Sequence, residues 1–420
     1  MNYRNRDSLQ FQTLRITKDS IRHWKRRFDA RRGLIASSLT GQILRDYYAD
    51  DSKWFYKAYV DGETRAFPVF TRPEWVTTAQ RPDDIIKSVD DTGVYDYDEG
   101  FLQRVALQKA SLDIDESMAP IEVSARDRFW NDTIYRISDI HTNEDGGFSL
   151  DVGLTDYFSY VTHSTKLADE FYDKAQVNDV TVDTPPAKAS AALNGKLSIR
   201  DTHANDFEAI QNYSYAHLLG ALVTLVVKMP NGEYYVAVQN RSDNTVDYPD
   251  SKGVAPSGSF SVWYNPKLEC NLTYHALREF GEEVFNREAL RSPPTSANAS
   301  EPANKSIPVR VLADLLADPD GGAYLLATGL GFEALTAASQ LSMLLYIDDP
   351  VFSAWVYDFV EYQSKEMIEG DIEMVEVTDA AKSLLTDDWV PGAAFSLSQG
   401  LRTLTDEFSV DIGIDLTPQN

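Results

Sequence analysis

The sequence predicts an α+β protein with two domains, and three observations support this. Its 420 residues exceed what one ordinary hydrophobic core holds, so two cores are expected. The first half alternates short apolar and polar runs between turn residues, which is typical of strands. The second half has a long apolar run at 218–228, a turn, a partner strand and then helical patterns. We expect an N-terminal α+β accessory domain over 1–190, a linker over 191–210 and a second domain over 211–420.

Composition indicates a globular protein without disulfides. Hydrophobic residues make up 43% of the chain, too many for a disordered one. No apolar run reaches the roughly 18 residues that cross a bilayer. The start, MNYRNRDSLQFQT, lacks the apolar stretch of a secretory signal. Cys270 is the single cysteine, so no internal disulfide forms. We therefore expect a cytoplasmic protein.

Charge is distributed unevenly along the chain, whose formal net charge is −26. Residues 1–50 hold about 11 Lys and Arg against 5 Asp and Glu, whereas residues 301–420 hold about 5 against 21. Such an acidic half repels nucleic acid and phosphate-rich ligands unless a divalent cation intervenes. An acidic surface that only maintains solubility is the alternative interpretation.

The segment Lys18–Arg32 is basic and helical in pattern. Ile21, Trp24 and Phe28 recur at helical spacing among arginines and lysines. The segment is either a helix that binds nucleic acid or an acidic partner, or a surface helix that packs its aromatic stripe on its own domain.

Several strands are expected in the first half, each beside a turn. The expected strands are Trp54–Val60 and Ala66–Phe70 around Asp61-Gly62, and Phe129–Ile137 and Phe148–Leu154 around 143–147. A strand end at Asp156 is expected to continue into a helix. Thr184–Phe207, with Pro185-Pro186 and an Ala/Ser run, is expected to be a connecting stretch.

The residues that point to chemistry lie in the segment LREFGEEV. Asn271 is a plausible N-cap of the helix that contains it. On an α-helix Glu279, Glu282 and Glu283 stand at i, i+3 and i+4 and share one face. Three like charges there need a positive partner, and a hard divalent cation prefers such carboxylate oxygens. Arg278, beside them, can hold a carboxylate through a bidentate contact.

Two neighbouring features support a site at this helix. Its opposite face is apolar, and a loop rich in Pro, Ser and Gly precedes it. Pro256, Ser257 and Gly258 in this loop can bring backbone N–H groups to the phosphates of a ligand. The apolar face consists of Leu272, Ala276, Phe280 and Val284.

These residues resemble the Nudix hydrolase superfamily, whose box is G-x5-E-x7-R-E-U-x-E-E-x-G-U, with U apolar. Residues 278–283 match the central R-E-U-x-E-E without a gap, and Pro256-Ser257-Gly258 is similar to the Pro-Gly-Gly that precedes the box. A helix opened by Asp388–Pro391 and ending near Phe408 is also similar. The resemblance covers about Leu218 to Phe408. It implies a Nudix-like α/β/α sandwich with a mixed sheet, Mg²⁺ or Mn²⁺ as cofactor, and a nucleotide-diphosphate-like substrate.

For the site, the resemblance implies that Glu279, Glu282 and Glu283 bind the metal. It assigns catalysis to Glu282, Glu283 and Arg278, and ligand binding to the loop Pro256-Ser257-Gly258. A further acid from the downstream half often acts as a base or ligand in the family. The candidates are Glu361, Glu366, Glu369 and Glu373.

The sequence departs from the box at four of nine defining positions. Tyr264 and Cys270 stand where the box has its first Gly and first Glu, and Phe285 and Asn286 replace its late Gly and last apolar residue. Glu269, one residue out of register, is a substitute for the missing acid. The divergent Nudix box leaves two functions open. One is a pyrophosphatase-type hydrolase of a nucleoside diphosphate linked to another moiety. The other is an inactive Nudix-fold module that binds a nucleotide-like ligand or a protein.

Other features have weaker functional interpretations. A thiol near a helix N-terminus, as at Cys270, can be a nucleophile. The sequence offers only His275 as a neighbouring partner for it, and His275 is itself expected to be a packed residue. The segment Arg291–Pro308 is expected to be a flexible insertion, or a lid over the site. The acidic half does not favour nucleic acid as a partner. We expect no membrane partner. We expect the chain to form a homodimer.

Overall fold

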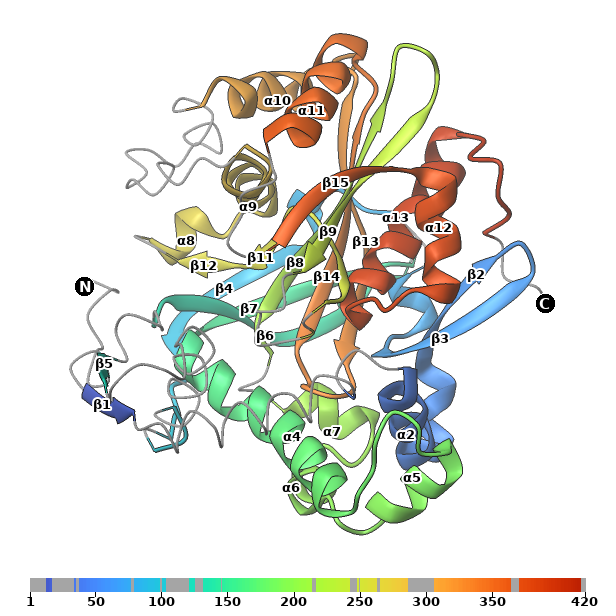
Figure 1. The fold of residues 1–420 in the computed structure, drawn as a ribbon. Coiled ribbons are helices and arrows are strands. Elements are labelled where there is room, and N and C mark those ends of the chain that lie inside the picture. Colours follow the sequence, from blue (N-terminus) through green and yellow to red (C-terminus); the bar gives the residue numbers. More distant parts are fainter. Residues whose placement is uncertain are drawn as a thin grey trace.

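The protein was analysed as a computed structural model that describes most of the chain (Figure 1). The described residues are 13–16, 34, 38–76, 79–98, 100–102, 121–124, 131–144, 146–213, 217–241, 248, 250–262, 265–285, 306–363 and 370–416. The basic segment Lys18–Arg32 lies outside them, as does nearly all of the insertion Arg291–Pro308.

A nine-stranded mixed sheet forms the centre of the molecule. Its strands are β2 (Phe55–Val60), β3 (Glu63–Phe70), β8 (Leu219–Lys228), β9 (Tyr234–Arg241), β10 (Lys252–Val254), β11 (Ser257–Ser259), β13 (Ala323–Glu333), β14 (Ser339–Ile347) and β15 (Gly370–Glu376). The order is β10-β9-β8-β14-β13-β3-β2, with β11 paired to β8 and β15 to β9. β14 and β8 run parallel, and the other pairs are antiparallel.

Local sequence explains the hairpins of this sheet. Asp61 and Gly62, between β2 and β3, adopt φ values of 49° and 84°, which Asp and Gly tolerate and which match the strand twist. Gly232, with φ of 91°, turns β8 into β9. The predicted strands at 54–60, 66–70, 218–228 and 233–240 are confirmed to within a few residues.

Helices cover both faces of the sheet, as Figure 1 shows. They are α9 (Leu272–Glu279) and α11 (Pro350–Gln363) on one face, and α12 (Val377–Thr386) and α13 (Pro391–Phe408) on the other. Successive residues of β8 belong to different cores: Leu225 packs in the core of the α9 side and Val226 in the core of the α12–α13 side. This alternation is the period of a strand. The α+β class and the mixed sheet between helical layers are thus confirmed, as is the helix ending at Phe408.

A second, four-stranded sheet lies beside the first. Its strands are β4 (Ile86–Gly93), β6 (Thr133–Thr142), β7 (Phe148–Asp156) and β12 (Ser261–Val262), in the order β12-β6-β7-β4. A two-stranded sheet pairs β1 (Thr13–Ile16) with β5 (Ile121–Ser124). The expected strand–helix transition is confirmed, because the Asp156 carboxylate accepts from the Ser159 N–H at the start of α4 (Tyr157–Val177).

The stretch expected to connect two domains is helical. It contains α5 (Pro186–Leu193) and α6 (Ser198–His203), and α7 (Phe207–Asn212) begins where it ends. Arg200 on α6 is fully buried and contacts α2 (Ser38–Tyr48) and the turn after β13. Its Ala, Leu and Ile side chains pack against the core, and its role as a connection between two domains stays a prediction.

Strand pairing crosses the expected boundary between the two halves. The β2–β3 hairpin pairs with β13, and β12 pairs with β6. The division into domains at 191–210 stays a prediction, and these pairs show how closely the two halves are joined. The remaining short elements are 49–54, 73–75, 82–84, α8 (Pro266–Glu269) and α10 (Ile307–Ala317).

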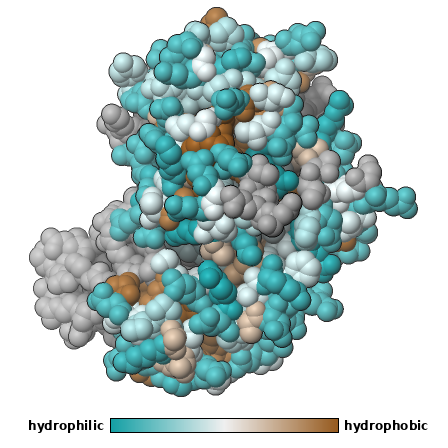
Figure 2. Space-filling model, turned by 90° about the vertical axis from the view of Figure 1, so that its right-hand side faces the viewer, coloured by the Kyte–Doolittle hydropathy of each residue, from teal (hydrophilic) through white to brown (hydrophobic). Residues whose placement is uncertain are grey.

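Most large apolar side chains are buried in these cores. The face of the molecule in Figure 2 is accordingly mostly hydrophilic, with hydrophobic residues confined to limited areas. Within the described residues, no helix combines the length and the hydropathy that crossing a bilayer requires.

Candidate functional site

The helix that carries the glutamates changes character in its middle. The Asn271 side chain accepts from the Tyr274 N–H at 2.7 Å, which confirms the predicted N-cap. α9 is regular as far as Glu279, and Phe280–Val284 then form a π-helical turn. The prediction that Glu279, Glu282 and Glu283 follow α-helical spacing is therefore wrong beyond Glu279, because the wider turn shifts the two later residues around the axis. Single π-helical turns are frequent at functional sites.

The apolar face of α9 and of this turn packs in the core. All four predicted apolar residues, from Leu272 to Val284, are buried. Phe285 is buried too, with its ring centroid 4.4 Å from Phe359 and 5.2 Å from Phe280. The position where the family has glycine thus carries a core residue, and its φ of −109° needs no left-handed conformation.

A buried ion pair lies at the end of α9. Arg278 Nη2 donates to Glu279 Oε1 at 2.6 Å, and Arg278 Nε to the same oxygen at 3.2 Å. Both residues are buried. Burial acts to lower the pKa of Arg278, but the Glu279 carboxylate outweighs it and raises that pKa. Arg278 thus contacts a carboxylate as predicted, but not in the predicted bidentate form, because one oxygen accepts both bonds.

His275 completes this polar group from one turn earlier. Its Nδ1 lies 3.0 Å from Arg278 Nη2, so the imidazole accepts there. Burial and the Arg278 charge hold the pKa of His275 well below its usual value, which keeps the ring neutral. As expected, His275 is a packed residue, and it helps to orient Arg278.

The predicted loop contacts the glutamates directly, although Ser257 and Gly258 are not in a loop but in the short strand β11, paired with β8. The Ser257 N–H donates to Glu283 Oε2 at 2.8 Å. A Cβ atom on Gly258 would lie 2.7 Å from Glu279 Cδ, so only glycine allows this carboxylate to approach the loop. The structure thus brings Ser257, Gly258, Glu279 and Glu283 together from β11 and the α9 helix.

The three glutamates do not share one point in space. Among the described residues, the three-residue group whose ligand atoms all lie within 4.8 Å of one another is Asp139, His141 and Asp151. Glu279 instead faces Arg278, and Glu283 faces Ser257. Binding of a metal by all three glutamates stays a prediction, and it requires these side chains to turn toward the ion.

The group of Asp139, His141 and Asp151 lies on the second sheet. Asp139 on β6 pairs in register with Asp151 on β7, after a bulge, and His141 follows two residues later on the same face. His141 Nε2 lies 2.7 Å from Asp151 Oδ2, and the Ser88 hydroxyl donates to Asp151 Oδ1 at 2.6 Å. These hydrogen bonds, that of Ser88 first, lower the pKa of Asp151. Sequence reasoning missed this group, whose only local signal is Asp and His two residues apart on a strand.

Cys270 and Glu269 occupy roles other than those of the box. Burial raises the pKa of Cys270 to about 12, so the thiol is a poor nucleophile. Glu269 Oε1 accepts from the Asn265 N–H at the start of α8. The substitution of Glu269 for the missing acid stays a prediction.

The downstream acids are dispersed. Glu361 Oε1 accepts from the Met374 N–H at 3.1 Å, which joins α11 to β15, and Glu373 is exposed on β15. Glu366 and Glu369 lie outside the described residues.

Comparison with known proteins gives weak similarity to solved structures only. No protein-family model and no curated protein matches this chain. Among solved structures, the crystal structure of a Nudix hydrolase from M. smegmatis, RenU, aligns with 13% identity over 45% of this chain and 86% of that chain, at a TM-score of 0.22. A TM-score this low supports no conclusion about fold or function, so the function proposed below rests on the residues of this chain.

Proposed function

We propose that the α9 helix and the loop of Pro256, Ser257 and Gly258 form a divalent-metal site that hydrolyses a phosphoanhydride bond in a nucleoside diphosphate linked to another moiety. The observation that carries the proposal is the contact between loop and helix, in which Ser257 N–H binds Glu283 and Gly258 accommodates Glu279. The Nudix resemblance assigns these two glutamates to metal binding and the segment of Ser257 and Gly258 to ligand binding.

The donor set suits Mg²⁺ or Mn²⁺, because it offers carboxylate oxygens, which hard cations prefer. Glu279, Glu282 and Glu283 would hold the ion, and Gly258 leaves the space that the Glu279 carboxylate fills. A bound divalent ion neutralises a diphosphate and lowers the pKa of an attacking water. Arg278, which is held by Glu279 and His275, orients the first carboxylate. In this proposal the Ser257–Gly258 backbone would face a phosphate of the ligand.

The second candidate is a Nudix-fold module that binds a nucleotide-like ligand or a protein without chemistry. Two observations favour it. Arg278 already neutralises Glu279, and the three glutamates are not gathered among the described residues. Buried Phe285 and partly buried Cys270, whose raised pKa keeps the thiol protonated, are consistent with two departures from the box having a structural role.

The test measures hydrolysis and Mn²⁺ binding together. The full chain with Mg²⁺ or Mn²⁺ is incubated with ADP-ribose, NAD, dinucleoside polyphosphates, nucleotide sugars and nucleoside triphosphates. We expect cleavage of one class, lost in Glu282→Gln and in Glu283→Gln. No cleavage in the whole panel would sink the hydrolase. Calorimetry that shows Mn²⁺ binding unchanged in Glu279→Gln would favour the module.

Two control variants make the binding result specific. Glu407→Gln removes one exposed carboxylate from α13 and should change neither activity nor binding. His141→Ala disrupts the group of Asp139, His141 and Asp151. If His141→Ala removes the Mn²⁺ signal while Glu282→Gln does not, the ion binds on the second sheet and the proposed site is wrong.

Partners and location belong to the same proposal. We expect a nucleotide-diphosphate-like small molecule as ligand, no nucleic acid, a cytoplasmic location and a homodimer. Light scattering on the purified chain measures the oligomeric state, and a monomeric mass would contradict the homodimer.

A further inference from the structure

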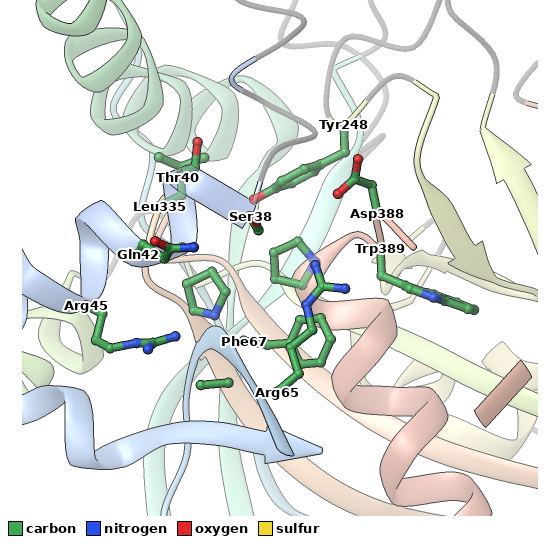
Figure 3. A pocket seen from close by; sticks show the side chains of 14 residues that line it. Ser38, Thr40, Gln42, Arg45, Arg65, Phe67, Tyr248, Leu335, Asp388 and Trp389 are labelled. Atoms are coloured by element: carbon green, nitrogen blue, oxygen red, sulfur yellow. The ribbon is translucent and has the colours of Figure 1, made fainter. Parts of the chain in front are cut away.

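A cavity of about 240 Å³ opens between α2, β3 and the segment that precedes α13. Figure 3 shows side chains from all three converging on it. None of its lining residues belongs to α9 or to the loop of Pro256, Ser257 and Gly258. The cavity is therefore a separate place from the proposed metal site, and a function there is independent of the hydrolase proposal.

Two arginines line this cavity in a chain of strongly negative net charge. Arg65 is fixed at one wall, because its Nη1 donates to the carbonyl oxygens of Asp387 at 2.7 Å and Leu384 at 3.1 Å. Its guanidinium lies 5.0 Å from the Phe67 ring centroid, which holds it further. A pre-positioned guanidinium recognises a carboxylate or a phosphate with little loss of side-chain entropy.

Arg45 faces the same space from α2. No hydrogen bond or ion pair joins Arg45 to another residue within the described part of the chain. Gln42, one turn earlier, likewise lines the cavity, and Figure 3 shows both side chains directed toward its interior. The wall formed by α2 thus offers a full positive charge and an amide that no described residue uses.

The rest of the lining divides into an apolar part and an acid. Phe67 and Tyr248 are buried and line the cavity with aromatic side chains, which suit a flat body, whereas the Trp389 ring points away from it in Figure 3. Asp388 stands at the rim, where its carboxylate can accept a hydrogen bond from a hydroxyl or amino group. The volume is below the range typical of drug-sized ligands, so the occupant is small.

From these features we propose that the cavity binds a small organic anion. This anion has a ring body, with a carboxylate or phosphate group held by Arg45 and Arg65. A hydroxyl or amino group on the ring contacts Asp388. A bare inorganic anion lacks the ring that the aromatic walls require, and a neutral ring lacks the charge that the arginines require.

Matched probes separate these contributions in calorimetric titrations of the full chain. Benzoate and phenyl phosphate carry ring and charge, with the two acid groups compared directly. Benzamide keeps the ring without the charge, and inorganic phosphate keeps the charge without the ring. 4-Aminobenzoate and 4-hydroxybenzoate add the group that faces Asp388. We expect the acids with rings to bind about tenfold or more tightly than benzamide or inorganic phosphate, since each lacks one class of contact.

Three variants complete the test. Arg45→Gln replaces an exposed guanidinium by a shorter, neutral amide and should weaken the binding of benzoate or phenyl phosphate about tenfold or more. Asp388→Asn should reduce only the additional affinity that 4-aminobenzoate and 4-hydroxybenzoate have over benzoate. Arg310→Gln, on an exposed face of α10, is the control and should change nothing. The proposal is overturned if no ring-bearing acid binds, if benzamide binds equally well, or if Arg45→Gln binds like the unmodified chain.

The same variants keep this proposal distinct from the hydrolase. Arg45→Gln should leave metal-dependent cleavage at saturating substrate unchanged, and Glu282→Gln should leave benzoate binding unchanged. If instead Arg45→Gln abolishes cleavage, the cavity belongs to the substrate site and the inference of a separate site is wrong.

Discussion

Arg200 Nη2 donates a hydrogen bond to the carbonyl oxygen of Leu335 at 2.6 Å, across 135 residues of sequence. The same guanidinium donates through Nη1 to the Tyr48 hydroxyl at 2.6 Å and to the Ala334 carbonyl. One fully buried side chain therefore joins α2, α6 and the turn after β13.

Replacing Arg200 by Met should destabilise the protein by about 3–5 kcal/mol, because buried carbonyl oxygens would lose their donors. Urea unfolding followed by circular dichroism measures this loss. Arg402→Met, which removes an exposed i,i+4 pair with Asp406, should cost less than about 1 kcal/mol. Equal effects of the two substitutions would contradict the proposed role of Arg200.

Gly258→Ala should impair the proposed metal site more than the fold. The new Cβ would meet Glu279 Cδ at 2.7 Å, so the carboxylate must move and its contact with Arg278 must change. We expect Mn²⁺ affinity to fall about tenfold or more, with a stability loss of about 1–3 kcal/mol. In Gly100→Ala the new Cβ meets nothing closer than 3.4 Å, so this control should keep both properties. Unchanged Mn²⁺ affinity in Gly258→Ala would place the ion elsewhere.

Phe285→Ala should destabilise the protein by about 3–5 kcal/mol, because the ring packs on Phe280 and Phe359. Phe285→Gly, which restores the residue of the family's box, should destabilise it at least as much and should not raise activity. Thermal unfolding and the hydrolysis panel measure both effects. A stabilised or more active Phe285→Gly would show that the ring is not a core contact.

Stability should fall in mild acid because of His217. Burial lowers the pKa of His217 to about 4, below its unfolded value near 6.5, while its Nε2 donates to the Ile210 carbonyl at 2.7 Å. A base with a depressed folded pKa binds fewer protons when folded. Stability is therefore complete above about pH 6.5 and lost as pH falls toward 4, by about 3 kcal/mol for this group. Urea titrations at several pH values should show a shallower acid loss in His217→Gln. Identical profiles would contradict the assignment.

Cys270 should react slowly in the native protein. Burial raises the pKa of its thiol to about 12 from 9.0, so at pH 8 the thiolate is about a thousandfold rarer than in the unfolded chain. A chromogenic disulfide reagent should therefore label Cys270 promptly in urea and only through unfolding in buffer. Similar rates in the two conditions would show that the thiol is accessible and ionised.

Local signals in the sequence predicted the local structure well. The Asn271 cap, the Asp61-Gly62 turn and the helix that ends at Phe408 each depend on residues within a few positions of one another. The contact of Ser257 with Glu283 was not predicted, because the sequence suggested only that this segment could approach a ligand.

Other features depend on packing between distant residues. The π-helical turn occurs where Phe280, Val284 and Phe285 are buried in the core, and helical periodicity in the sequence does not predict it. The group of Asp139, His141 and Asp151 requires a strand register that includes a bulge. The cavity between Arg45 and Arg65 requires α2 to lie beside β3, and no local pattern specifies this.

The pairing of the β2–β3 hairpin with β13 has a consequence for biosynthesis. Phe70 pairs with Phe332, and 262 residues separate them. At a synthesis rate of about 5–20 residues per second, the hairpin leaves the ribosome roughly 13–50 seconds before its partner strand exists. During that interval β3 presents an unpaired edge that other chains can join. The central sheet is thus completed only after nearly the whole chain has been made, and its assembly depends on how long that edge is protected.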